Sequence, residues 1–304
     1  MTTVDNAPLY TPTQLSGSER ATRWLRDIGW RHVVGIVMIP ICLLPILIAV
    51  SMSFKGPTAT LNSSDSQALF TSFELTTYEE LFASSLFPQW ALNSVLICAI
   101  TAIGTVIMGS AAAYAFSRFR FAGRRGGLTA LLIVQMFPQM LAFVAVMLLV
   151  TSLGKVFPFL GENSPLALIA IYLGGALGSN AFLMYGFFNT VPRELDEAAK
   201  IDGASHAQIF WGIIFRLVVP ILTVVGLLSF VGTYGDFILA KVIMTQEQNY
   251  TLAVGLYLWA SRPEVTPWGL FAAGAVIAAV PIIVLFMFLQ KYIVSGLTAG
   301  SVKG

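Results

Sequence analysis

The chain has 304 residues, of which 57% are hydrophobic and only 11% are charged, and its formal net charge is +2. Soluble domains carry about 25% charged residues, so this composition excludes a water-soluble globule of this size and favours a protein whose main solvent is lipid. Both cysteines, Cys42 and Cys98, lie in apolar runs, so the sequence supports neither a disulfide framework nor a metal cluster.

Six apolar segments are long enough to cross a bilayer, which requires about 20 mainly apolar residues. A helix of that length forms its backbone hydrogen bonds within itself, as the hydrocarbon interior demands. The segments are 32–54, 90–116, 127–152, 165–188, 217–240 and 268–290. The sequence therefore predicts an all-α integral membrane protein with six transmembrane helices.

The distribution of basic residues predicts the orientation. If the N-terminus is cytoplasmic, thirteen of the 17 Lys and Arg residues lie inside and four lie outside, as the positive-inside rule requires. Both termini are then cytoplasmic. The four arginines that follow the second span are explained as topology-setting charges that contact anionic lipid; they are Arg118, Arg120, Arg124 and Arg125.

The predicted organisation has three parts. Residues 1–31 form a cytoplasmic N-terminal segment, partly disordered because its beginning is polar and contains Pro8 and Pro12. Residues 32–290 form the transmembrane domain, and residues 291–304 form a cytoplasmic tail. We expect external loops at 55–89, with a short helix near Tyr78, and at 241–267.

The cytoplasmic loop 189–216 carries the strongest local signals. Three acidic residues within 194–197 suit the first turn of a helix, where they complement the helix dipole. Gly203 suits the left-handed position that ends a helix. Ser205 and Gln208 have the spacing of a capping box, which begins a second helix. The loop is therefore predicted to form a short helix, a glycine turn and a second helix that leads into the fifth span.

The first of these helices has an apolar side formed by Leu195, Ala198, Ala199 and Ile201. A short helix laid in a groove of a partner protein is a standard recognition mode. The alternative is an interfacial helix that rests on lipid headgroups. Helix periodicity alone leaves both interpretations open.

The residues Glu197-Ala198-Ala199, followed three residues later by Gly203, resemble the cytoplasmic E-A-A…G signature of permease subunits of binding-protein-dependent ABC importers. The resemblance implies a type I ABC-importer permease fold, in which this loop, the coupling loop, sits in a groove of a separate ATPase. Phe215 and Arg216 replace the family's leucine and proline, and Pro220 is expected to supply the bend. The predicted ATPase-coupling residues are Leu195, Glu197, Ala198, Ala199, Gly203 and Ile213.

A second resemblance covers the C-terminal part of the chain. The segments 250–255, 271–276 and 281–282 and the closing run 296–304 are similar to the smaller permease subunit of maltose and maltodextrin importers, with Ser301 in place of a glycine. The resemblance implies a tail that reaches between two ATPase subunits. The residues expected to contact the ATPases there are Gly296, Thr298, Gly300 and Lys303.

Asp236, Tyr234 and Asn180 are the candidate substrate-pathway residues. Asp236 is the only acid inside a predicted span, and an ionisable residue at that depth is a functional candidate by default. Its surroundings resemble an aromatic-x-[Asn/Asp/Glu]-Phe stretch common in sugar permeases. The alternatives are a solvated Asp236, or one paired with Lys241, and polar side chains that only join neighbouring helices.

No G-x-x-x-x-G-K-[Ser/Thr] phosphate loop occurs, so the chain is predicted not to be an enzyme, and ATP and Mg are expected in a partner. The resemblances imply a carbohydrate importer in the bacterial inner membrane. Its expected partners are a homologous second permease, two ATPase subunits, an extracytoplasmic sugar-binding protein and membrane lipid, without nucleic acid. The alternative is an ion-gradient-driven secondary transporter, which usually has more spans, internal repeats and several intramembrane charges.

Overall fold

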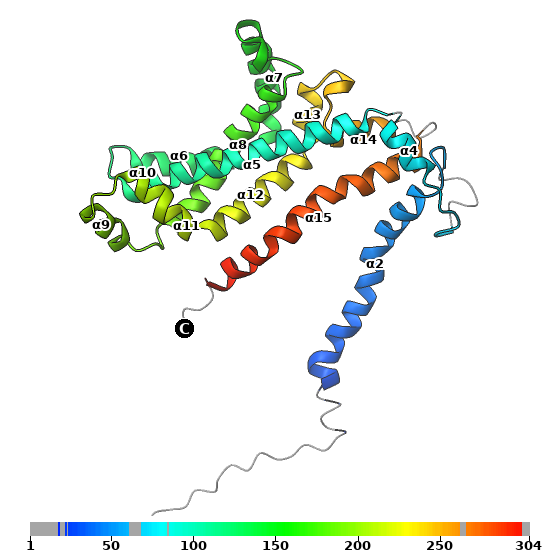
Figure 1. Ribbon diagram of the computed structural model, residues 1–304, viewed down its shortest axis with the longest axis horizontal. Helices are drawn as coiled ribbons and strands as arrows, with labels where there is room; N and C mark the ends of the chain where they lie inside the picture. The colour runs from blue at the N-terminus through cyan, green and yellow to red at the C-terminus, as the bar shows by residue number, and fades with distance from the viewer. Residues whose placement is uncertain are drawn as a thin grey trace, which may run out of the picture. The chain divides into compact units, whose positions relative to one another are not determined.

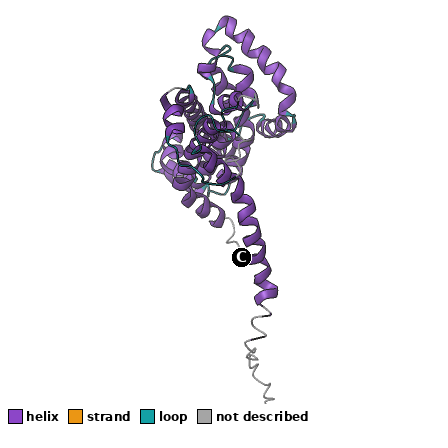
Figure 2. Ribbon diagram, turned by 90° about the vertical axis from the view of Figure 1, so that its right-hand side faces the viewer, coloured by secondary structure: helices purple, strands orange, loops and turns teal. Residues whose placement is uncertain are grey.

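The computed structural model describes residues 18, 22, 24–60, 68–83, 85–261 and 266–299. All regular elements among these residues are helical, as Figure 2 shows. The predicted N-terminal disorder concerns residues that lie almost entirely outside this set. The chain divides into two units, Met1–Val50 and Ser51–Gly304, which are considered separately.

The first unit consists of the π-helical turn η1 (Leu25–Gly29) and most of α2 (Trp30–Ser53). Helix α2 contains Pro40 and Pro45, which membrane helices tolerate because their neighbours and local adjustments satisfy the freed carbonyl groups. The helical stretch Arg26–Ser53 is long and apolar enough to cross a membrane. It begins a few residues before the predicted first span.

The second unit contains all the other helices, drawn in Figure 1. They are α4 (Thr76–Ala83), α5 (Phe87–Arg118), α6 (Arg124–Met136), α7 (Gln139–Val156), η2 (Pro158–Leu160), α8 (Pro165–Phe188), α9 (Glu194–Ile201), α10 (His206–Ile209), η3 (Phe210–Ile214), α11 (Phe215–Leu217), α12 (Val219–Tyr234), α13 (Ile238–Ile243), η4 (Glu247–Asn249), α14 (Leu252–Ala260) and α15 (Trp268–Ala299). The short external helix predicted near Tyr78 corresponds to α4.

Three helices in the described part of the chain have the length and composition of a membrane span, and as many as six do if each of three bent pairs counts as one. The straight ones are Arg26–Ser53, Phe87–Arg118 and Trp268–Tyr292. The pair α6 and α7 is bent by 106°, and its break contains Pro138, whose ring prevents a continuous helix. All six predicted apolar segments are thus helical, and three of them are not straight.

The prediction that the fifth span runs from 217 to 240 is wrong at its far end. Helix α12 ends at Tyr234, and α13 begins only at Ile238. Hydropathy did not reveal the break, because Phe237 and the residues of α13 are as apolar as the helix before them. Asp236 therefore lies between two helices and not inside a continuous one.

Helix α5 is the central element of the second unit. It packs against α8, α12, α14 and α15, and Figure 1 shows it running beside α12 and α15. The approach of α14 is especially close, because a Cβ atom added to Gly255 would lie 2.1 Å from the Trp90 ring. A residue with any side chain could not occupy position 255 without displacing either the Trp90 ring or α14.

The Phe87 end of α5 also holds the segment that leads into α14. Trp90 Nε1 donates to the carbonyl of Glu247 at 2.7 Å, and Asn93 Nδ2 donates to the carbonyls of Gln248 and Tyr250 at 3.1 Å each. The hydroxyl of Ser94 accepts from the backbone N–H of Leu252 at 2.7 Å. Four hydrogen bonds therefore attach residues 247–252 to one end of this helix.

Asn163 fixes the other side of the same segment. Its side-chain oxygen accepts from the N–H groups of Thr245 and Gln246 at 2.7 and 2.8 Å, and its own N–H donates to Ile243 at 2.9 Å. Asn163 adopts a φ of +60°, a left-handed conformation that asparagine tolerates better than most residues. Residues 243–252 are thus held from two directions.

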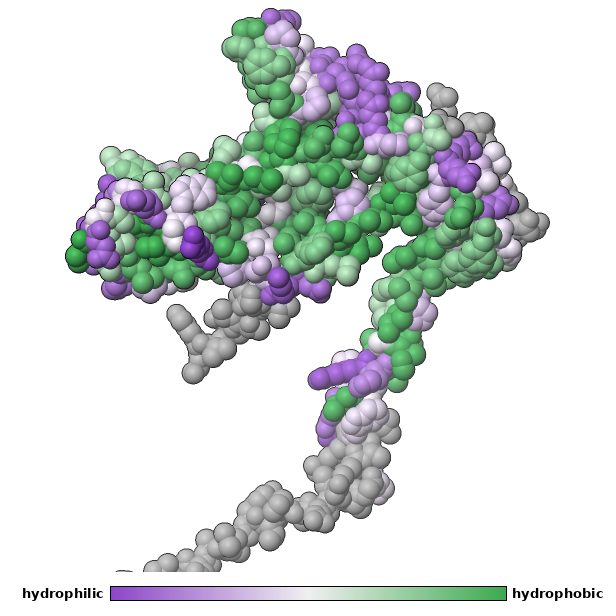
Figure 3. Space-filling view, viewed as in Figure 1, coloured by the Kyte–Doolittle hydropathy of each residue, from purple (hydrophilic) through white to green (hydrophobic). Residues whose placement is uncertain are grey.

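The hydropathy of the surface agrees with a membrane environment. Figure 3 shows apolar residues over α5, α12 and α15, with hydrophilic residues gathered around α9 and α10 and again near α13 and α4. Large apolar side chains such as Leu92, Ile103 and Phe288 are exposed on these helices. Such a surface is stable in lipid or against another apolar protein surface, but not in water.

Candidate functional site

The coupling loop folds as its sequence predicts. Helix α9 ends in a Schellman motif: the N–H of Gly203 donates to Lys200 at 3.0 Å, and the N–H of Ala204 donates to Ala199 at 2.9 Å. Gly203 has a φ of +83°, a conformation in which a residue with a Cβ atom is strained. The predicted glycine stop is confirmed.

The second helix begins with the predicted capping box. The Ser205 hydroxyl accepts from the N–H of Gln208 at 3.3 Å, and the Gln208 side chain accepts from the N–H of Ser205 at 2.7 Å. Helical structure then continues through η3 and α11 to Leu217. A bend of 79° separates it from α12. Pro220 lies in the first turn of α12, which agrees with its expected place at the bend.

Helix α9 has an inner and an outer face. Asp196 and Ala199 are buried, whereas Leu195, Ala198 and Glu197 are exposed, and Ile201 is 87% exposed. The apolar side expected from the sequence is therefore divided. Ala199 packs inward against a hydrophobic cluster that includes Met184, Phe188 and Ile209. Ile213 is half-buried at the edge of the same cluster, and Gly203 is exposed.

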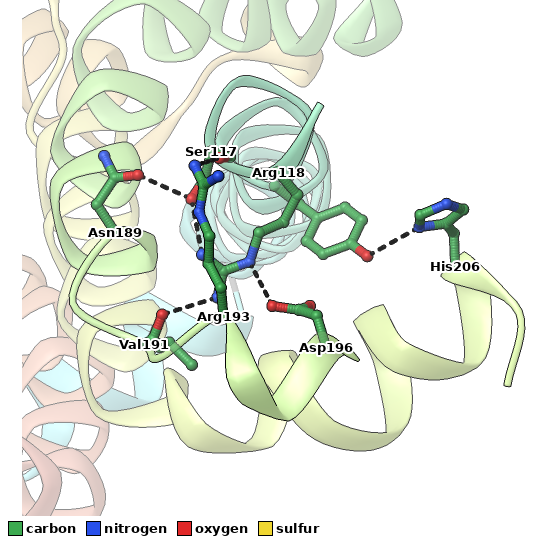
Figure 4. Close-up of polar contacts among 8 residues, drawn as sticks. Ser117, Arg118, Asn189, Val191, Arg193, Asp196 and His206 are labelled. Carbon is green, nitrogen blue, oxygen red and sulfur yellow. Dashed lines mark hydrogen bonds and ion pairs between the residues drawn. The ribbon is translucent and has the colours of Figure 1, made fainter. Parts of the chain in front are cut away.

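A buried ion pair fastens the inner face of α9 to the end of α5. Arg118 Nε lies 2.8 Å from Asp196 Oδ2, and the two side chains are only 6% and 7% exposed. Arg118 also donates to the carbonyl of Val191 at 3.0 Å and to the hydroxyl of Ser117 at 3.2 Å. Figure 4 shows these groups together between α9 and the end of α5. Arg118 is the only basic partner of Asp196 among the described residues.

Neighbouring hydrogen bonds extend this network along the loop. The Ser117 hydroxyl donates to Asn189 at 2.9 Å, and Arg193 donates to the Ser117 carbonyl at 3.1 Å. The Tyr114 hydroxyl lies 3.5 Å from Nδ1 of His206, in α10. Figure 4 shows that the contacts come from both helices of the loop. The last turn of α5 thus holds the beginning, middle and second helix of the coupling loop.

The explanation of the four arginines as topology-setting charges is incomplete for two of them. Arg118 is in the buried pair, and Arg124 donates to the Tyr185 hydroxyl at 3.2 Å with its guanidinium 5.9 Å from the Tyr185 ring centre. Arg120 and Arg125 are exposed. Sequence reasoning missed Arg118 because its partner is 78 positions away, and no local spacing links them.

The substrate-pathway candidates do not form one group. Asp236 and Asn180 line the same cavity of about 430 Å³, between α7, α8 and α12. Tyr172, Ser229 and Thr233 add hydroxyl groups to its wall. Tyr234 points elsewhere: it is buried, and its hydroxyl donates to the carbonyl of Ala278 in α15 at 2.9 Å.

Asp236 has a structural task of its own. Its Oδ1 accepts from the Tyr172 hydroxyl at 2.9 Å and from the N–H groups of Leu239 and Ala240 at 3.1 and 3.2 Å, so it caps α13 and attaches it to α8. The pairing with Lys241 is not seen. Lys241 instead lies over the Tyr250 ring, 4.9 Å from its centre.

The C-terminal candidates can be described only in part. Gly296 and Thr298 lie in the last turns of α15, whereas Gly300 and Lys303 are outside the described residues. The described residues hold no group of three or more His, Cys, Asp or Glu side chains that could bind a metal ion.

In the second unit, bent and straight apolar helices carry the helix–turn–helix of α9 and α10 at one end (Figure 1). A bacterial ABC transporter involved in the import of the polysaccharide alginate has a similar structure, with a TM-score of 0.74 over 93% of this chain and 100% of that one, at 22% identity. The sequence model of the family "Binding-protein-dependent transport system inner membrane component" matches residues 105–299. The chain belongs to this family of multi-pass inner-membrane permease subunits.

Several curated relatives are similar over most of their length. The maltodextrin transport system permease protein MdxG of Bacillus subtilis is 42% identical over 86% of this chain and 90% of the relative. The galactooligosaccharides transport system permease protein GanQ of the same organism is 43% identical over 75% and 79%. The maltose/maltodextrin transport system permease protein MalG of Vibrio vulnificus is 39% identical over 90% and 95%.

Proposed function

We propose that this permease subunit belongs to an ATP-driven carbohydrate importer of the maltose and maltodextrin type, and that it forms half of the translocation pathway. The observation that carries the coupling part of the proposal is the outer face of α9, where Leu195, Ala198 and Ile201 are apolar but exposed. Relatives named for maltodextrin, galactooligosaccharides and maltose support a carbohydrate substrate.

The topology in this proposal has six spans and two cytoplasmic termini. Residues 1–31 are the N-terminal cytoplasmic segment, 32–290 the transmembrane domain and 291–304 the tail. The distribution of Lys and Arg supports this orientation. It places α9 and α10 in the cytoplasm, at the level where an ATPase would dock, and residues 243–252 outside.

Three kinds of partner complete the transporter in this proposal. A homologous permease supplies the other half of the pathway, two ATPase subunits bind ATP and Mg, and an extracytoplasmic protein delivers the sugar. The family description, which names binding-protein dependence, supports the last of these. ATP-driven closure of the ATPases would push Leu195, Glu197, Ala198, Gly203 and Ile213 and so reorient the pathway, while Ala199 anchors α9 from inside. The tail residues 296–303 would contact the ATPases.

The polar cavity is the proposed sugar passage through this subunit. Asn180, Asp236 and the nearby hydroxyl groups offer donors and acceptors that match the hydroxyls of a carbohydrate, and the cavity has the size of an ordinary ligand pocket. Tyr234 contributes indirectly, because it holds α12 against α15.

Replacing Asp236 with asparagine tests this passage. Asparagine keeps an acceptor that can cap α13 but removes the charge, and hydrogen bonds to charged groups are worth about 1.5 kcal/mol or more, roughly tenfold in affinity. We expect about a tenfold loss in the rate of maltodextrin uptake at low concentration. Glu80→Gln, which neutralises an exposed acid on α4, is the control. Equal uptake in both variants would argue against sugar contact at Asp236.

The proposed function is tested by mild-detergent purification of the tagged protein from its host, with mass spectrometry of the proteins that accompany it. An ATPase and a second permease are expected. Purified complexes in proteoliposomes should then import labelled maltodextrin only with internal ATP and external binding protein. Uptake driven by an imposed proton or sodium gradient without ATP would favour the secondary-transporter alternative.

A further inference from the structure

Helix α5 carries polar attachments at both of its ends, to two segments that the proposed function places on opposite sides of the membrane. Its Arg118 end holds the coupling loop, and its Phe87 end holds residues 247–252. We infer that α5 is a mechanical link that transmits the docking of the external binding protein to the ATPase-coupling helix. This inference rests on the proposed function.

The attachment at the Arg118 end resists separation. Neither oxygen of Asp196 has a conventional hydrogen-bond donor among the described residues, so Arg118 is its compensating charge. Moving α9 away from α5 would separate the Asp196 carboxylate from the one charge that compensates it, which costs more than separating an exposed pair. Helix α9 therefore moves with the last turn of α5.

The attachment at the Phe87 end has a different chemistry. It consists of neutral hydrogen bonds: Trp90 and Asn93 donate to backbone carbonyls of 247–252, and the Ser94 hydroxyl accepts from the N–H of Leu252. Because α5 contacts the backbone of residues 247–252, the position of this segment does not depend on the side chains of its own residues. Asn163 holds the preceding residues, so the segment is a firm surface and not a loose loop.

Helix α5 itself is suited to act as a rod. Its 32 residues correspond to a length of about 48 Å, more than the roughly 30 Å of the hydrocarbon core, and its one proline, Pro88, lies in the first turn. Midway, the buried Ser229 hydroxyl of α12 donates to Thr105 of α5 at 3.2 Å. A displacement at one end would therefore reach the other with little bending.

The test uses the assembled transporter in proteoliposomes and measures how strongly the sugar-loaded binding protein stimulates ATP hydrolysis. At the inner end, Arg118→Gln and Asp196→Asn are combined, so that no buried charge is left unpaired. The control, Arg125→Gln, removes the same positive charge from an exposed position. In the double variant we expect the stimulation of ATP hydrolysis to fall about fivefold or more, because coupling between two sites usually amounts to a factor of about five or more. In the control the stimulation should equal that of the wild type.

At the outer end, Asn93→Ala removes two hydrogen bonds to 247–252. Stimulation should again fall, although the ATPase still co-purifies, because this position is at the opposite end of α5 from the coupling loop. Wild-type stimulation in Asn93→Ala, or in an assembled double variant, would overturn the link. If the double variant does not assemble, the Asn93→Ala result decides. A wild-type protein that never recruits an ATPase would instead refute the proposed function.

Discussion

Gly203→Pro is expected to abolish ATP-driven uptake while the protein remains in the membrane. Proline fixes φ near −65°, whereas position 203 has a φ of +83°, and proline also removes the N–H that donates to Lys200. A misplaced proline costs about 3 kcal/mol, which reduces the population of the native turn roughly 100-fold. Initial uptake rates, normalised to the membrane content of the protein, measure the effect.

Two further substitutions separate the shape of the turn from the contacts of the loop. In Gly203→Ala, the Cβ atom strains the left-handed backbone at position 203 by only about 1–2 kcal/mol, so this variant should reduce uptake less than Gly203→Pro does. Glu197→Lys reverses an exposed charge without altering the backbone, and should uncouple ATP hydrolysis from uptake through the docking surface alone. Normal uptake in both Gly203→Pro and Glu197→Lys would exclude the coupling role of this loop.

Arg118→Ala is expected to have the largest effect on stability. It leaves the Asp196 carboxylate buried and unpaired, and breaking a buried pair in this way costs about 3–5 kcal/mol. It also removes the hydrogen bond to Val191. We expect a low yield of monodisperse protein in detergent and an apparent Tm well below that of the wild type.

Arg125→Ala is the matched control for this prediction, because it removes the same charge from the same cluster at an exposed position. Its yield and Tm should equal those of the wild type. If Arg118→Ala and Arg125→Ala behave alike, the topology explanation suffices for all four arginines. If only Arg118→Ala is unstable, the buried pair is responsible.

Local signals in the sequence predicted the coupling loop well. The left-handed position of Gly203 and the capping box of Ser205 and Gln208 depend on residues at most a few positions apart, and such interactions follow directly from residue type. The apolar segments were equally visible. Their bends were not, because a break between two apolar helices leaves the mean hydropathy unchanged.

The features that the sequence did not predict depend on tertiary packing. Ala198 and Ala199 are chemically identical, and it is tertiary packing that turns Ala199 inward, into the cluster with Met184 and Phe188, and Ala198 outward. The Arg118–Asp196 pair joins residues far apart in the chain. Asp236 was recognised as unusual, but its capping of α13 depends on where α12 stops.

The turn between α9 and α10 affects how tightly a partner protein would bind, because its backbone groups already form hydrogen bonds within the loop. Its backbone groups are already satisfied by Gly203, Ala204 and the capping box, so the loop holds its shape before any partner arrives. Little conformational entropy remains to be lost on docking, which favours affinity from a small contact area. A partner protein would therefore meet a loop that needs no refolding in order to bind.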